Sequence, residues 1–176
     1  MAAVTLAHAA SLTSMVIAFS LGKKAFAEHE SFLETTAARL ESIRGEALSL
    51  ADQDAEAFKA LAPLFKLKKD DPMRQAMVLP AVTAAIKPPA AMLALAAETA
   101  TLCQALFGRT SKMLRSDLAI GACLAAAAAD AAAWNVRINL PMLQEAGGDA
   151  ALNDEINETA KRTSAIAAAV SAACRA

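Results

Sequence analysis

The 176-residue sequence has few aromatic residues and almost no net charge, and each shortage excludes a class of structure or partner. Aromatic residues make up only 4% of the chain and tyrosine is absent, so the side chains that favour β-strands are scarce. Seventeen basic residues stand against eighteen acidic ones, which leaves a net charge of −1. Because a basic surplus is what attracts nucleic acids and anionic lipids, we expect neither as a partner.

Cysteine and histidine are too few and too scattered for a metal site or a disulfide framework. Cys103, Cys123 and Cys174 are widely spaced among apolar residues, whereas a zinc site requires close pairs and a disulfide framework an even number. His8 and His29 fit no metal-ligand spacing. We therefore expect no metal, and reduced thiols in a cytoplasmic protein.

Two apolar stretches have the length of a targeting or membrane segment. Residues 4–21 do not resemble a signal peptide, because no positive charge precedes them and Lys23 and Lys24 fall where cleavage would occur. Residues 118–134 are long enough to span a membrane but include Asp130 and have very small side chains. We interpret both stretches as core helices of a soluble protein and expect no membrane association.

Alanine dominates what is present, filling 48 of the 176 positions. Alanine is the best helix former, and no stretch alternates apolar and polar residues as a half-buried strand does. The sequence therefore predicts one all-α domain over residues 1–176, a bundle of about six helices. Because alanine-rich surfaces bury little area per residue, we expect two copies to pair as a homodimer through these helices.

Glycine and proline positions determine the predicted helix boundaries. Gly22 is typical of a position just past a helix end, and Asp71 followed by Pro72 is typical of a helix start. Pro88 and Pro89 predict the end of one helix and the start of the next. The predicted helices cover residues 2–21, 28–64, 72–86, 88–107, 118–140 and 150–174.

One acidic residue of the second predicted helix lies on an apolar face. At about 100° per residue, Asp54 shares a face with Leu50, Phe58 and Leu61. Asp52 lies on another face, where water reaches it easily. A desolvated carboxyl has a raised pKa, which suits proton transfer. Asp54 is therefore either a candidate general acid or an exposed acid on a kinked helix.

Two polar clusters bracket the apolar helix over residues 118–140. Ser116 and Asp117 precede it, and Asn135, Arg137 and Asn139 lie at its end. Asp117 and Asn135 are five helical turns apart, roughly 27 Å, so one small ligand cannot contact both within a chain. Two antiparallel chains can bring one end of each together. The clusters are either binding residues or helix caps.

Four segments in order resemble the cyclodeaminase/cyclohydrolase family. They are Gly22-Lys23-Lys24 after an alanine-rich helix, DAEAF at 54–58, SDL at 116–118 and NVRINL at 135–140. The family includes the cyclodeaminase part of formiminotransferase-cyclodeaminase and stand-alone bacterial methenyltetrahydrofolate cyclohydrolases. The resemblance covers nearly the whole chain, and it implies an all-α dimeric protein that binds folate near the dimer interface.

The resemblance also implies an activity and a set of site residues. It implies a folate one-carbon enzyme that interconverts 5-formiminotetrahydrofolate or 10-formyltetrahydrofolate with 5,10-methenyltetrahydrofolate, with no cofactor beyond the tetrahydrofolate substrate. Asp54 falls on the family's proposed proton donor, so we expect it to be catalytic. The expected substrate-binding residues are Lys23, Lys24, Phe58, Ser116, Asp117, Asn135, Arg137 and Asn139.

One part of the family's pattern is not found. Family members open with a Pro-Gly-Gly-Gly-Ser turn before the first helix, whereas this sequence begins Met1-Ala2-Ala3-Val4. We therefore expect the glycine-rich turn, a natural place to hold an anionic or carbonyl group, to be missing. The alternative function is a non-catalytic helical interaction protein that keeps the bundle and has lost the site. The intact DAEAF and NVRINL segments favour the enzyme.

Overall fold

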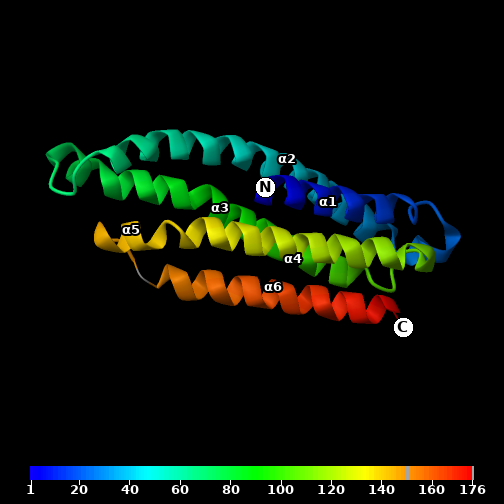
Figure 1. Ribbon diagram of the computed structural model, residues 1–176. Coiled ribbons are helices and arrows are strands. Elements are labelled where there is room, and N and C mark those ends of the chain that lie inside the picture. Colours follow the sequence, from blue (N-terminus) through cyan, green and yellow to red (C-terminus); the bar gives the residue numbers. More distant parts are fainter. Residues whose placement is uncertain (150, 176) are drawn as a thin grey trace.

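Five long helices account for most of the chain in the computed structural model, which describes residues 1–149 and 151–175 (Figure 1). No strand occurs among these residues, so the predicted all-α class is confirmed. The long helices are α1 (Ala2–Ala18), α2 (Glu30–Leu61), α3 (Pro72–Leu106), α4 (Arg115–Arg137) and α6 (Leu152–Arg175). The short ones are α5 (Leu140–Glu145) and the 3₁₀ helices η1 (Lys24–His29), η2 (Ala62–Lys66) and η3 (Lys112–Leu114).

The long helices lie side by side in an elongated bundle (Figure 1). Helix α4 is central and packs against α1, α3 and α6, while α2 packs against α1 and α3. One end of the bundle carries η1 and the connection from α3 to α4, and the other carries η2 and α5 (Figure 1). Helix α1 begins near the middle of the bundle, so it runs along only the half that leads to η1 (Figure 1).

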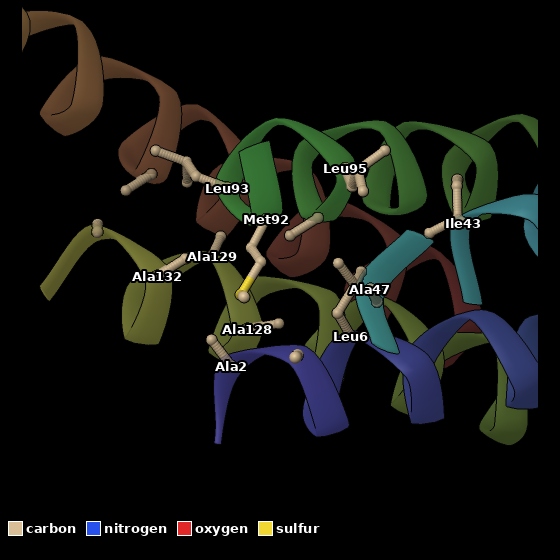
Figure 2. Close-up of a cluster of buried hydrophobic side chains, with 14 of the residues drawn as sticks. Ala2, Leu6, Ile43, Ala47, Met92, Leu93, Leu95, Ala128, Ala129 and Ala132 are labelled. Atoms are coloured by element: carbon tan, nitrogen blue, oxygen red, sulfur yellow. The ribbon is translucent and has the colours of Figure 1, made fainter. Parts of the chain in front are cut away.

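The core is built from small residues of α4 and larger ones of its neighbours. Figure 2 shows Ala128, Ala129 and Ala132 of α4 facing Leu6 of α1 and Met92 of α3. At Gly121 of α4, an added Cβ would lie 2.7 Å from Thr13 Oγ1 of α1, so the two helices approach each other closely there. Small side chains on α4 therefore allow three helices to approach it closely.

Ion pairs join α2 to α3 beside this core. The Arg39 guanidinium donates two parallel hydrogen bonds to the Glu98 carboxylate, 2.6 and 2.7 Å long. It donates a third, of 2.6 Å, to Glu46 on its own helix. This fork geometry orients the two longest helices relative to each other.

The predicted helix break at Pro88-Pro89 is wrong, because α3 runs unbroken from Pro72 to Leu106. A proline inside a helix costs about 3 kcal/mol through a lost hydrogen bond and a steric clash. Pro88, Pro89 and the neighbouring Ile86 and Met92 are all buried, so packing against the core offsets this cost. The segments predicted as two helices are therefore one.

Other predicted boundaries agree more closely. Asp71 caps α3 as expected, accepting hydrogen bonds from the backbone N–H groups of Met73 and Arg74 at 2.9 and 3.3 Å. Helix α1 ends at Ala18, earlier than predicted, and the chain turns at Gly22 with φ of +70°. The helix predicted to continue to residue 140 ends at Arg137, and α5 begins at Leu140.

Two segments are long and apolar enough to cross a membrane on length and composition alone. They are Pro72–Leu106 and Lys112–Glu145. Both contribute buried residues to the bundle, as core helices of soluble proteins also do. The expected lack of membrane association therefore stays a prediction.

Candidate active site

Asp54 lies in the wall of a pocket of about 420 Å³ at the α5 end of the bundle. Residues of α2, α3, α4 and α5, together with η2, form the wall. The lining residues are Asp54, Phe58, Leu61, Phe65, Ala85, Asn135, Ile138, Asn139 and Met142.

The helical period brings Asp54, Phe58 and Leu61 to one face of α2, as the sequence indicated. Leu61 is buried and Phe58 is exposed, so this face runs from the core to the pocket mouth. Leu50 lies one turn earlier and lines a different groove, between α2 and α3. Asp52 is exposed, as expected for the opposite face.

The surroundings of Asp54 favour its neutral form. Burial raises the pKa of the Asp54 carboxyl, and the positive charge of the N-terminal amine partly opposes this shift. Among the described residues, no side chain forms a hydrogen bond or ion pair with Asp54 that would stabilise its carboxylate. A half-buried carboxyl of raised pKa can donate a proton closer to neutral pH than an ordinary aspartate can.

Two asparagine amides line the same pocket, Asn135 in the last turn of α4 and Asn139 just before α5. Asn139 Nδ2 donates a hydrogen bond of 2.9 Å to the backbone oxygen of Asn135, one turn earlier. This bond orients the Asn139 side chain and uses only one of its donors. Asn135 and Asn139 therefore offer amide donors and acceptors opposite the Asp54 carboxyl.

Arg137, between these two asparagines, faces away from the pocket. Its Nε donates a hydrogen bond of 3.0 Å to Asn157 Oδ1 of α6. Its guanidinium lies over the Trp134 ring, 5.4 Å from the ring centre. In this chain, Arg137 joins α4 to α6 and does not line the pocket that contains Asp54.

The other expected binding residues lie at the opposite end of the bundle. Lys23 and Lys24 lie at the start of η1, and Asp117 lies in the first turn of α4 (Figure 1). Ser116 lines a groove between α4 and α6 that also contains Cys123. Within one chain, the structure therefore brings together four of the expected site residues: Asp54, Phe58, Asn135 and Asn139. Lys23, Lys24, Ser116 and Asp117 lie apart from that pocket.

The sequence analysis missed several pocket residues. Phe65 and Met142 come from η2 and α5, and Ala85 comes from the middle of α3. No local pattern marks them, because their contribution depends on how distant helices meet.

A second, more polar pocket of about 330 Å³ adjoins the first, and Met142 lines both. Its wall includes Lys69, Arg74 and Gln75. The Lys69 ammonium lies 3.2 Å from the Glu145 carboxylate, and both side chains are exposed. A ligand in the Asp54 pocket can thus extend past Met142 toward two basic side chains.

Among the described residues, no group of three or more histidine, cysteine, aspartate or glutamate side chains could hold a metal ion. All three cysteines are free thiols, and burial raises the pKa of the Cys103 thiol to about 11.

The fold and this pocket place the protein in the class of all-α cyclodeaminase-like bundles. The structure is similar to the crystal structure of formiminotetrahydrofolate cyclodeaminase from Thermotoga maritima, with a TM-score of 0.78 and 24% sequence identity. The alignment covers 99% of this chain and 83% of that one. No curated protein matches the chain.

The sequence itself places the chain in a family. Residues 1–160 match the model of the formiminotransferase-cyclodeaminase family, so the chain belongs to this family. The resemblance inferred from the four sequence segments is therefore confirmed. Family membership associates the chain with folate-related cyclodeaminase chemistry.

Proposed function

We propose that the protein is a folate one-carbon enzyme that interconverts 5-formiminotetrahydrofolate or 10-formyltetrahydrofolate with 5,10-methenyltetrahydrofolate. The main support is the pocket in which Asp54, of raised pKa, lies with two asparagine amides and several apolar side chains. Family membership supplies the substrate class. Each reaction transfers protons at one carbon, so it requires a titratable group and no redox partner.

In the proposed deaminase reaction, Asp54 acts as the general acid. As the substrate's N10 attacks the formimino carbon, the N10 proton passes to the formimino nitrogen and the neutral Asp54 carboxyl donates a second proton to it. The bond from the carbon to that nitrogen then breaks, which releases ammonia and leaves the methenyl cation and the Asp54 carboxylate. In the proposed hydrolytic reaction, the Asp54 carboxylate accepts a proton from the water that attacks the methenyl carbon. Asp54 then returns this proton to N5 as the carbon–N5 bond breaks, and the remaining hydroxyl proton is released to water, which leaves the 10-formyl product. The raised pKa of Asp54 allows both protonation states to be populated closer to neutral pH.

The proposed binding mode follows the two adjoining pockets. The flat ring system packs on the apolar side chains of Phe58, Phe65 and Ile138, and its polar edge meets the Asn135 and Asn139 amides. The glutamate tail extends past the shared Met142 toward Lys69 and Arg74, since carboxylates bind Lys and Arg side chains well.

We further propose a homodimer in which the partner contributes the residues from the other end of the bundle. Exposed apolar side chains along α4 and just after it support pairing: Ile120, Trp134 and Ile138 are 50%, 67% and 78% exposed. An antiparallel partner would bring its own Lys23, Lys24, Ser116 and Asp117 toward the Asp54 pocket. Light scattering over a wide dilution range should detect the dimer, and a monomer at every concentration would contradict it.

The decisive experiment compares Asp54→Asn with Asp52→Asn. The first substitution keeps the shape of the side chain and removes its proton, and the second alters an exposed neighbour two residues away. Because general acid–base catalysis contributes on the order of 10²–10⁴-fold, turnover should fall by this factor for Asp54→Asn alone. The near-ultraviolet absorbance of the methenyl cation follows either reaction.

The same assay tests the alternative of a non-catalytic interaction protein. Wild-type protein that neither turns over the two substrates nor binds folate would favour that alternative. Near-normal turnover by Asp54→Asn would leave the enzyme proposal standing but remove Asp54 as its acid. We also propose that the protein is cytoplasmic, a location in which its three free thiols stay reduced. The assay should therefore be run in reducing buffer.

A further inference from the structure

The proline pair inside α3 deprives one backbone carbonyl of its helical donors. In an α-helix, the carbonyl of residue i accepts from the N–H of residue i+4, or of i+3 in a tighter turn. Proline has no N–H. For the Ala85 carbonyl, the residue at i+3 is Pro88 and the residue at i+4 is Pro89, so neither donor exists.

This double loss distinguishes Ala85 from the other carbonyls affected by prolines in α3. The Ala84 carbonyl lacks a donor only at i+4, where Pro88 stands, and the Lys87 N–H remains available at i+3. Ala84 is also exposed to water. The Ala76 carbonyl likewise lacks a donor only at i+4, where Pro80 stands, and Ala76 is exposed. Ala85 is buried, so water cannot replace the missing donors as easily as it does at the other two positions.

Nearby side chains do not supply the missing donor. Thr83, the hydroxyl residue closest in sequence, donates to the carbonyl of Leu79 at 2.7 Å. The other two threonine hydroxyls of α3, those of Thr99 and Thr101, likewise donate to the preceding turn, to the carbonyls of Leu95 and Ala97. A buried carbonyl is nearly always paired, so the Ala85 oxygen requires a donor from outside the helix.

Ala85 lies in the wall of the pocket that contains Asp54. We infer that the Ala85 carbonyl is a substrate-positioning acceptor, freed by Pro88 and Pro89 to bind an N–H group of the pterin ring. This inference rests on the proposed folate activity and adds a residue to its binding site. The asparagine amides and the Ala85 carbonyl then recognise the polar edge of the ring from two sides, while Asp54 acts at the reacting carbon.

Pro89→Ala tests this assignment directly. An N–H introduced at position 89 bonds to the Ala85 carbonyl in the ordinary helical pattern and removes it as an acceptor for the ligand. Because a hydrogen bond of this kind contributes a factor of about 3–10 to binding, KM for the folate substrate should rise by that factor while kcat changes little.

Pro88→Ala is the matched control. It also removes one buried proline ring from the same turn, but its new N–H lies at i+4 to the exposed Ala84 carbonyl and can reach the Ala85 carbonyl only from i+3, in a tighter turn. Its KM should therefore rise less than that of Pro89→Ala. Equal KM changes in the two variants would mean that lost packing, and not the carbonyl, is responsible, and would overturn the inference.

A ligand comparison separates hydrogen bonding from shape. A folate analogue methylated at the ring N–H should bind more weakly than folate to the wild-type protein, and the two should bind Pro89→Ala with more similar affinity. The same discrimination in both proteins would overturn the inference.

Amide hydrogen exchange provides a readout that needs no folate. The amide introduced in Pro89→Ala should exchange slowly, because it bonds to the Ala85 carbonyl, and rapid exchange would show that this carbonyl was never available. Failure of the wild-type protein to bind any folate would instead contradict the proposed function and the pterin as occupant.

Discussion

The close approach of α1 to α4 predicts that Gly121→Ala destabilises the fold although alanine is the better helix former. An added Cβ at position 121 would lie 2.7 Å from Thr13 Oγ1, whereas ordinary contacts begin at 3.4 Å. The Thr13 hydroxyl cannot move freely, because it donates to the Ala9 carbonyl at 2.8 Å and lies 3.3 Å from Cys103 Sγ. Either the two helices separate or Thr13 loses these contacts.

The expected magnitude combines three effects. Overpacking a core costs about 1–3 kcal/mol. Loss of the Thr13 hydrogen bond adds about 1 kcal/mol, and replacing a helical glycine returns about 1 kcal/mol through helix propensity. The net loss in the free energy of unfolding should therefore be about 1–3 kcal/mol.

Gly45→Ala is the matched control in α2. No atom lies within 4 Å of a Cβ at this exposed helical position, so only the propensity gain remains. This variant should gain about 0.5–1 kcal/mol. Urea unfolding followed by far-ultraviolet circular dichroism measures both changes.

The two glycine variants should thus change stability in opposite directions. The Thr13→Ala background removes the clashing hydroxyl, so Gly121→Ala should lose most of its penalty there. A Gly121→Ala protein as stable as the wild type, or an equal penalty in both backgrounds, would refute the reasoning.

Two further predictions concern Asp54 and the start of α3. Because burial raises the pKa of Asp54 above its ordinary value of 3.8, its neutral form contributes stability below that pH, and this contribution is lost as pH rises through the raised pKa. Asp54→Asn should therefore gain stability relative to the wild type across this pH range, and parallel stability curves would contradict it. Asp71→Ala removes a cap that accepts from Met73 and Arg74, and urea unfolding should show a loss of about 1 kcal/mol. An unchanged midpoint would mean that water satisfies those N–H groups equally well.

Part of the candidate site was predictable from helical periodicity. Asp54, Phe58 and Leu61 repeat at intervals of four and three residues, which suffices to place them on one face of α2. Asn135 and Asn139 are likewise four residues apart and share a face. The first set could be predicted because it lies within two turns of α2. The second could be predicted because both asparagines fall in the predicted helix over residues 118–140, although α4 ends at Arg137 and Asn139 lies just beyond it.

Helical periodicity could not predict that these two faces meet in one pocket. It depends on α2 and α4 meeting at the η2 and α5 end, together with Ala85 of α3. Arg137 lies between the two asparagines in sequence, yet it binds Asn157 of α6 instead of facing the pocket. A single sequence contains no local signal for either outcome.

The sequence by itself determined that the chain is helical and where its clearest helix start lies. Alanine propensity and the Asp71 cap act over a few neighbouring residues, so they operate in the same way in any tertiary context. Only the tertiary structure decided that α3 continues through Pro88 and Pro89, because burial of both rings offsets the local cost of two prolines. It also decided which polar residues share a pocket with Asp54, since that depends on packing between helices distant in sequence.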